Sequence, residues 1–192
     1  MRPSSTALAA AGRAILHGRE SLVEDWAGWM TRRLSSPQGT GHPSLLRQLT
    51  LLIDLLAEVT GPLRRQATDL WLSASEWYGR TAAERGLATG EVVEEFQHLR
   101  ELLIVHLSEL IAALPARQSL ATVLRLNRAL DQGIAHAVVG YTDSLFETLL
   151  NQRGVPVRAP GIDDDLAKRL TQFEQELADL RARAKRTRTE SG

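Results

Sequence analysis

The chain contains 192 residues, with 23 basic and 23 acidic side chains and no cysteine. Without cysteine it cannot carry out thiol catalysis, build a zinc-finger or iron–sulfur site, or switch through sulfur oxidation. The balanced charge argues against a generally basic nucleic-acid-binding protein and leaves room only for a local basic patch.

Apolar residues recur at spacings of three and four along most of the chain, which is the period of one face of a helix. Glycine and proline interrupt this pattern at Gly18, across 35–43, at Gly61 and Pro62, at Gly86 and at Pro115. The spacing therefore predicts six helices, at about 5–17, 19–34, 44–60, 63–85, 90–114 and 119–150.

The last two of these predicted helices carry the longest apolar stripes. In 90–114, for which Thr89 is the expected N-cap, the stripe is Val92, Phe96, Leu99, Leu103, Leu107, Leu110 and Leu114. In 119–150 it is Val123, Leu130, Ile134, Val138, Tyr141, Leu145 and Leu149. No alternating pattern typical of a strand appears. We therefore predict an all-α fold in which residues 1–150 form a bundle of five or six helices, with a globin-like arrangement as one option.

The C-terminal part of the chain has a different character. Residues 151–161 are rich in glycine and proline and read as a linker, 162–188 as a heptad helix, and 189–192 as a tail. The heptad stripe must be buried on something else, either a second copy or the helical domain of the same chain. Its narrow width favours a paired coiled coil, so we expect an oligomer or partner interface at Leu166, Leu170, Phe173, Leu177 and Leu180.

Few residues form a pattern that supports chemistry. Glu95 and His98 have the Glu-x-x-His spacing of di-iron bundles, but such a site needs a second pair, which the sequence lacks. His98, His106 or His136 could ligate haem, yet a histidine in an ordinary structural role is the favoured interpretation. No nucleophile elbow or phosphate-binding glycine loop is present. We therefore expect no enzyme activity, cofactor or metal.

The basic residues between Arg181 and Arg188 could contact phosphate, but a solubilising charge cluster at a helix end is the favoured interpretation. A binding partner of nucleic-acid type is therefore not expected. The most apolar run, 102–114, is too short to cross a bilayer, and the alanine-rich start lacks the apolar core of a signal peptide. We expect a cytoplasmic protein that does not enter a membrane.

Three segments together resemble one family. The stretches 74–100, 126–131 and 137–141 resemble the RsbRD-type N-terminal domain, which precedes a STAS domain or a histidine kinase core. The positions that carry the resemblance are Arg85, Gly86, Glu95, Phe96, Arg100, Asn127, Asp131 and Tyr141. The resemblance implies a helical, dimeric input module that passes a conformational change to an output domain. Since no such domain follows in this sequence, the output is expected in trans.

The sequence thus predicts a non-enzymatic bacterial signalling protein that forms homodimers and contacts an unidentified signalling partner. Two alternatives stay open. One is a sensor that binds haem or a small apolar molecule in a pocket lined by Trp71, Trp77 or Phe96. The other is a nucleic-acid-associated regulator that uses the arginine-rich end.

Overall fold

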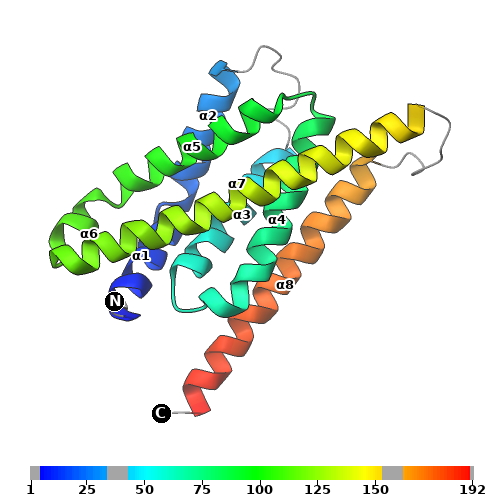
Figure 1. Cartoon of the computed structure of the whole chain (residues 1–192). Helices are drawn as coiled ribbons and strands as arrows, with labels where there is room; N and C mark the ends of the chain where they lie inside the picture. The colour runs from blue at the N-terminus through cyan, green and yellow to red at the C-terminus, as the bar shows by residue number, and fades with distance from the viewer. Residues whose placement is uncertain (1–4, 34–42, 153–161, 191–192) are drawn as a thin grey trace.

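A computed structural model of the chain describes residues 5–33, 43–152 and 162–190 (Figure 1). These residues form eight helices and no strand, which confirms the all-α prediction. None of the helices in these ranges is long and apolar enough to cross a membrane. The helices are α1 (Ser5–His17), α2 (Arg19–Arg33), α3 (Pro43–Thr60), α4 (Arg64–Glu84), α5 (Thr89–His106), α6 (Ser108–Ala113), α7 (Ala116–Gln152) and α8 (Ile162–Glu190).

The most extensive contact between two helices of the described residues is the packing of α4 against α7. A Cβ atom built on Gly79 of α4 would lie 1.7 Å from the carbonyl oxygen of Ala137 in α7. A Cβ atom on Gly140 of α7 would lie 1.8 Å from the carbonyl oxygen of Glu76 in α4. The two backbones are therefore in direct contact, and only glycine at these positions permits it.

The buried face of α7 differs from the predicted stripe. It consists largely of small residues, and Leu145 and Leu149 of the stripe are exposed instead. The reason is the contact with α4, which requires small side chains where the backbones meet. The residues that do face the core are Leu126, Ala129, Leu130, Gly133, Ala137, Gly140 and Tyr141.

The helix predicted at 90–114 is divided at Leu107, whose backbone turns out of helical geometry (φ −90°, ψ 0°) while its side chain stays buried. Among the described residues, seven helices therefore precede the C-terminal helix, where six were predicted. The N-cap of α5 is Ala88 rather than Thr89, and the carboxylate of Glu91 accepts a hydrogen bond from the Ala88 backbone N–H at 2.7 Å. The acidic side chain in the first turn thus replaces the hydroxyl that we expected to cap the helix.

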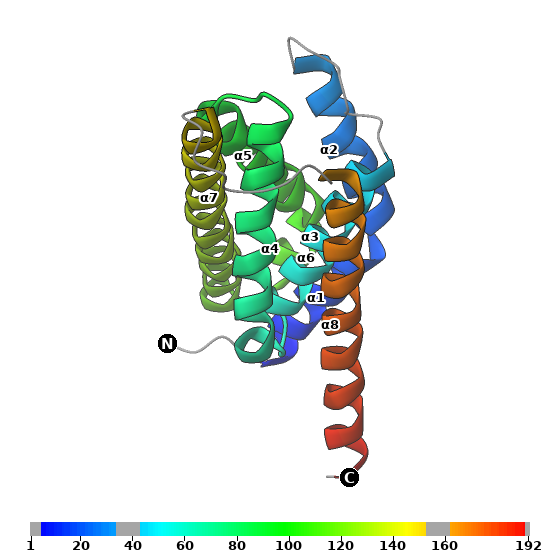
Figure 2. The ribbon, with the colours of Figure 1, turned by 90° about the vertical axis from the view of Figure 1, so that its right-hand side faces the viewer.

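The heptad helix, α8, lies along α3 and α4 of its own chain (Figure 2). Leu170, Phe173 and Leu177 are buried in the same hydrophobic cluster as the bundle, and Leu166 and Leu180 are half-buried. This is the folded-back alternative and not the paired coiled coil that the narrow stripe favoured. Of the predicted linker, 151–152 belong to the end of α7, and 153–161 lie outside the described residues.

Candidate functional site

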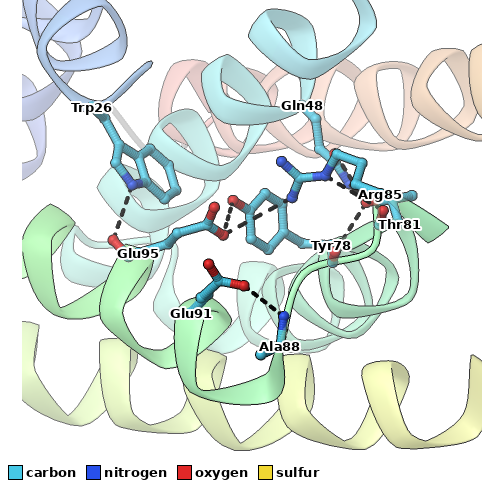
Figure 3. Close-up of polar contacts among 8 residues, drawn as sticks. All are labelled: Trp26, Gln48, Tyr78, Thr81, Arg85, Ala88, Glu91 and Glu95. Atoms are coloured by element: carbon cyan, nitrogen blue, oxygen red, sulfur yellow. Dashed lines mark hydrogen bonds and ion pairs between the residues drawn. The ribbon is translucent and has the colours of Figure 1, made fainter. Parts of the chain in front are cut away.

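The most unusual polar group of the structure is a carboxyl buried in the core (Figure 3). Glu95 of α5 is 1% exposed and lies on the apolar face of its helix, beside Phe96. The hydroxyl of Tyr78, from α4, donates a hydrogen bond to Glu95 Oε2 at 2.6 Å. Arg85 Nη2 lies 3.9 Å from the same oxygen, and its guanidinium stacks 5.3 Å from the centre of the Tyr78 ring. We call Trp26, Tyr78, Arg85 and Glu95 the Glu95 cluster.

Burial changes the acidity of this cluster. Removal from water raises the pKa of Glu95 to about 7, although the Arg85 charge and the hydrogen bond from Tyr78 act in the opposite direction. Burial also raises the pKa of Tyr78 well above its usual range, so that the phenol stays protonated and remains a donor. Glu95 can therefore take up or release a proton near neutral pH inside the core.

Aromatic side chains enclose the carboxyl. The indole N–H of Trp26, in α2, donates to the backbone carbonyl of Glu95 at 2.9 Å, and its ring stacks on Tyr78 with centroids 6.1 Å apart. Phe96 meets both rings edge-on, at 6.2 and 5.5 Å. Arg85 Nη1 and Glu95 Oε1 are buried and find no hydrogen-bond partner among the described residues. The cluster therefore has hydrogen-bonding capacity that the surrounding protein leaves unused.

The cluster connects three helices, and hydrogen bonds beside it reach a fourth. Trp26 comes from α2, Tyr78 from α4 and Glu95 from α5, while Gln48 of α3 donates to Thr81 Oγ1 at 3.1 Å. Thr81 in turn donates to the carbonyl oxygen of Tyr78 at 2.9 Å. A change in the charge of Glu95 therefore acts at a point where these helices meet.

Sequence reasoning identified Arg85 only through the family resemblance and Glu95 also through its Glu-x-x-His spacing, and it missed Tyr78 and Trp26 as polar partners. One signal could have found the site. Glu95 is a carboxylate at a helical spacing of three and four from Val92 and Leu99, and so it lies on an apolar face. A charged residue in that position must be paired or protonated.

Gly86 and Tyr141 shape the connection between α4 and α5. Gly86 has φ +80°, a left-handed conformation that favours glycine after a helix end. The hydroxyl of Tyr141, from α7, donates to the carbonyl oxygen of Leu87 at 2.7 Å and so holds this connection against α7. Both residues have structural roles next to the Glu95 cluster.

Replacement of Tyr141 by phenylalanine is expected to lower the free energy of unfolding by about 1 kcal/mol, the usual effect of losing one buried hydrogen bond. The Leu87 carbonyl would lose its partner while the aromatic ring stays in place. Urea denaturation followed by circular dichroism measures the change. An unchanged unfolding midpoint would contradict this role of the hydroxyl.

The remaining family-pattern residues lie apart from the Glu95 cluster. Arg100 of α5 forms an ion pair with Asp131 of α7 near the protein surface. Asn127, one turn earlier on α7, is half-buried, and its Oδ1 has no hydrogen-bond partner among the described residues. Phe96 packs against Trp71 in the core at 6.4 Å. The resemblance therefore combines core, connection and surface positions and does not outline one site.

The histidines do not converge with Glu95. The ring of His98 stacks on Trp29 at 4.5 Å, whereas Glu95 faces Tyr78 in the core. His106 contacts the backbone carbonyl of Ala14 at 2.9 Å, and His136 lies 3.5 Å from Glu76. Within the described ranges, no group of three His, Asp or Glu side chains is arranged to hold a metal ion.

The aromatic residues considered for a ligand pocket also serve as packing residues. Trp71 and Phe96 contact each other, and the Trp71 indole donates to the carbonyl oxygen of Ala129 at 2.9 Å. Trp77 lies on the other side of α4, where its ring is 5.8 Å from Phe173 of α8. These three side chains therefore do not surround one common space.

A second candidate region is the junction of α3 with α8. Arg47 binds Glu174 through two hydrogen bonds, at 2.7 and 3.2 Å, and Arg181 lies 2.6 Å from Glu58 and 3.5 Å from Asp54. Between these ion pairs runs a groove of about 640 Å³ with an apolar floor. Its lining includes Leu46, Leu51, Leu177, Ala178 and Ala182. Arg181, expected as part of a basic end, thus pairs with acidic residues of the same chain.

Replacing both Leu170 and Leu177 by aspartate is expected to release α8 while the rest of the bundle stays folded. Two charges would have to enter an apolar contact, which costs more than this narrow interface can offset. Limited trypsin digestion should then cleave within 168–186 at least about ten times faster. Lowering the free energy needed to detach α8 by about 1.4 kcal/mol raises the population of the cleavable, detached form about tenfold. Ala167→Asp, at an exposed position of α8, is the matched control. Equal cleavage of all three proteins would contradict the docked position.

Comparison with known proteins gives no further guide to the function of these regions. No protein-family model, curated protein or solved structure significantly matches this chain. The contacts of the described residues are therefore the basis on which a function can be argued.

Proposed function

We propose that this chain is a non-enzymatic bacterial regulatory protein that acts in the cytoplasm by binding other proteins, with its output supplied by a separate partner. The observation that carries the proposal is the position of α8. This helix has 29 residues, yet Leu170, Phe173 and Leu177 are its only fully buried side chains within 166–186. A long helix held by so narrow a contact can be displaced or extended by a partner.

The groove beside α8 gives such a partner a place to bind. Its floor is apolar, and its walls carry both acidic and basic side chains, including Arg47, Asp54, Glu174 and Arg181. An amphipathic helix fits this combination, because it can bury an apolar stripe between two charged edges. The Arg47–Glu174 ion pair that borders the groove is exposed on both sides, so it contributes little to stability and exchanges partners easily.

The resemblance to the RsbRD-type N-terminal domain supports the same proposal from the sequence. In that family a helical input module passes a change to a STAS or kinase domain. In this chain we assign the corresponding output to the protein that binds at α8.

The Glu95 cluster supports a second candidate, in which the input of the regulator is the proton concentration or a small polar ligand. The specific observation is the buried carboxyl of Glu95, whose pKa is about 7. One oxygen of this carboxyl and the Nη1 atom of the neighbouring Arg85 have unused hydrogen-bonding capacity. A change in this carboxyl would act on the helices that meet there and thereby on the surface that α8 covers.

The groove is tested by placing a photo-cross-linking amino acid, p-benzoylphenylalanine, at position 182 of the full chain in its source cells. We expect one cross-linked protein that carries a signalling output domain. Adding Leu46→Glu, at an exposed position on the opposite wall, should reduce this cross-link at least tenfold. Ala113→Glu, exposed on α6, is the matched control and should leave it unchanged. The absence of a cross-linked protein, or an equal loss with both variants, would contradict the proposal.

A further inference from the structure

The outer surface of α7 carries a row of exposed apolar side chains. Ten large apolar side chains are exposed among the described residues, and seven of them belong to α7: Leu120, Leu124, Val139, Leu145, Phe146, Leu149 and Leu150. Single exposed apolar residues are normal in a monomer, but two groups of them on one helix, at 120–124 and at 139–150, mark a surface that binds something.

These residues lie on one side of the helix. Starting from Leu120, steps of three or four residues lead along one face from one end of α7 to the other. We define the outer face of α7 by these exposed positions: Leu120, Leu124, Arg128, Asp131, Ala135, Val139, Thr142, Phe146 and Leu149. In Figure 2, α7 forms one margin of the molecule and α4 lies between it and α8. The outer face is therefore separate from the groove beside α8.

The neighbouring helix α5 extends this face. Arg100 of α5 pairs with Asp131 of α7, so the two helices are fixed side by side at this point (Figure 1). Ile104 follows Arg100 by one helical turn and is also exposed. The ion pair also neutralises Asp131, the one acidic residue of the outer face.

The outer face has a symmetric pattern about its middle residue, Ala135. Leu124 and Phe146 of this face lie 11 residues to either side of Ala135, and Leu120 lies 15 residues before it, as far as the exposed Leu150 at the edge of the face lies after it. An antiparallel copy of the same helix, crossing at Ala135, therefore places apolar against apolar at both ends. Ala135 itself is small and lets two helices approach closely. We propose that the outer face of α7 is the interface with a second copy of this chain, the two α7 helices packing antiparallel around Ala135.

Charges beside the outer face favour the antiparallel arrangement over a parallel one. The N-terminal half of α7 carries Arg125 and Arg128. Burial and the nearby positive charges of Arg64 and Arg128 lower the pKa of Arg125, which shows that positive charge is concentrated at this end of the helix. The C-terminal half carries the exposed Asp143, whereas Glu147 is already paired with Arg80 of α4 at 2.6 Å. Reversing one helix about Ala135 brings the basic half of each copy to the acidic half of the other. Parallel pairing would instead bring the basic halves together, which repels.

The length of the outer face is sufficient for a stable interface. From 120 to 150 the helix extends about 45 Å, and a strip about 12 Å wide along it has about 540 Å². Two such strips bury about 1,100 Å², which meets the lower limit for a specific interface. An antiparallel pair centred on Ala135 overlaps over this whole length, whereas a shifted pair would not.

This inference goes beyond the proposed function and does not depend on it, because the groove and the outer face of α7 lie on different sides of the bundle. The two proposals can also fail separately. Loss of partner cross-linking at position 182 leaves the pairing of α7 unaffected, and a monomeric chain leaves the groove unaffected.

Because the chain contains no cysteine, single cysteines report the arrangement directly. In the full chain under mild oxidation, Ala135→Cys is expected to form a disulfide-linked dimer, since this position meets itself at the centre. Leu124→Cys alone and Phe146→Cys alone should remain uncross-linked, because each lies about 33 Å from its own copy in the antiparallel pair. A mixture of these two variants should form the mixed dimer. Gln175→Cys, exposed on α8, is the control for random collisions.

Each other outcome overturns the inference. Self-cross-linking of Leu124→Cys would show a parallel pair, and a dimeric mass without any cross-link in α7 would place the interface elsewhere. Light scattering at about 10 µM gives the mass independently, and a mass of 21.2 kDa for the unmodified chain would show a monomer. The double variant Leu124→Glu/Phe146→Glu should raise the dimer dissociation constant at least about 100-fold. Its circular dichroism should not change, since both side chains are exposed.

Discussion

Replacing Gly79 by alanine is expected to lower the free energy of unfolding by about 3 kcal/mol or more, although alanine is the better helix former. The added Cβ would lie 1.7 Å from the Ala137 carbonyl oxygen, which belongs to the backbone of α7 and cannot rotate away. The two helices would have to separate by more than 1 Å along their contact, which disrupts the packing on both sides. In a chain of this length such a loss corresponds to a Tm lower by about 6–12 °C.

Gly90→Ala is the matched control for this substitution. Gly90 is also a helical glycine, in α5, but a Cβ atom there would meet nothing within 4 Å. Its replacement should raise stability by up to about 1 kcal/mol through helix propensity alone. Urea denaturation of both variants measures the difference. If Gly79→Ala unfolds at the same urea concentration as Gly90→Ala, then α4 and α7 do not touch in solution as they do in this structure.

The same contact shows why the sequence predicted some parts of the fold and not others. Helix positions followed from glycine, proline and apolar spacing, and the bounds predicted for α1 agree with the structure (Ser5–His17). The buried face of α7 could not be predicted in this way. Apolar spacing selects the largest hydrophobic residues, whereas this face is built from Gly133, Ala137 and Gly140 because the partner backbone is close. Leu145 and Leu149 of the predicted stripe therefore remain exposed, whereas Leu130 and Tyr141 face the core as predicted.

The position of α8 could not be predicted, because the sequence does not show which surface the bundle offers to this helix. A narrow stripe such as Leu170, Phe173 and Leu177 favours a partner helix, but the surface of a bundle can bury it as well. The choice depends on whether the bundle offers a complementary face. In this structure α3 offers Asp54 and Glu58, one turn apart, to Arg181, and α4 offers Trp77 to Phe173. Such complementarity between segments more than 90 residues apart becomes visible only once both have been placed.

The Glu95 cluster was predictable in part. A carboxylate on the apolar face of a helix signals a special environment, but its partners come from other helices at positions that carry no common motif. Tyr78 lies on the apolar face of α4 like an ordinary core residue, and only the structure shows its hydroxyl 2.6 Å from Glu95. A tyrosine in a predicted core is an ambiguous signal, since its ring and its hydroxyl serve different purposes.

The stability of the protein is expected to fall as the pH rises from about 4.5 to 7, because of Glu95. The pKa of its carboxyl is raised to about 7 in the folded chain, compared with 4.5 in the absence of burial. Below pH 4.5 the carboxyl is protonated in both states. Between the two values the unfolded chain releases its proton and the folded chain keeps it, so that unfolding becomes more favourable with rising pH. Above about pH 7 both states are ionised and the contribution no longer changes.

Glu95→Gln isolates this contribution from those of other titrating groups. Glutamine keeps an oxygen that can accept the hydrogen bond from Tyr78 and does not ionise. Between pH 5 and pH 8 the unmodified chain should therefore lose about 2–3 kcal/mol of unfolding free energy relative to the variant. Glu101→Gln, which removes an exposed carboxylate from the same helix, controls for the change in net charge. A pH-independent difference would show that Glu95 is ionised throughout and that Arg85 outweighs its burial.

Tyr78→Phe provides an independent test of the same carboxyl. The hydrogen bond from the phenol favours the ionised form of Glu95 and so holds its pKa below the value that burial alone would give. Without the hydroxyl, the pKa of Glu95 should rise further and the fall in stability should extend to a higher pH. Observation of the Glu95 carboxyl carbon by NMR during a pH titration measures this shift directly. A lower pKa in the variant would mean that water enters the space of the lost hydroxyl and solvates the charge, because only renewed access to solvent can offset the loss of a donor.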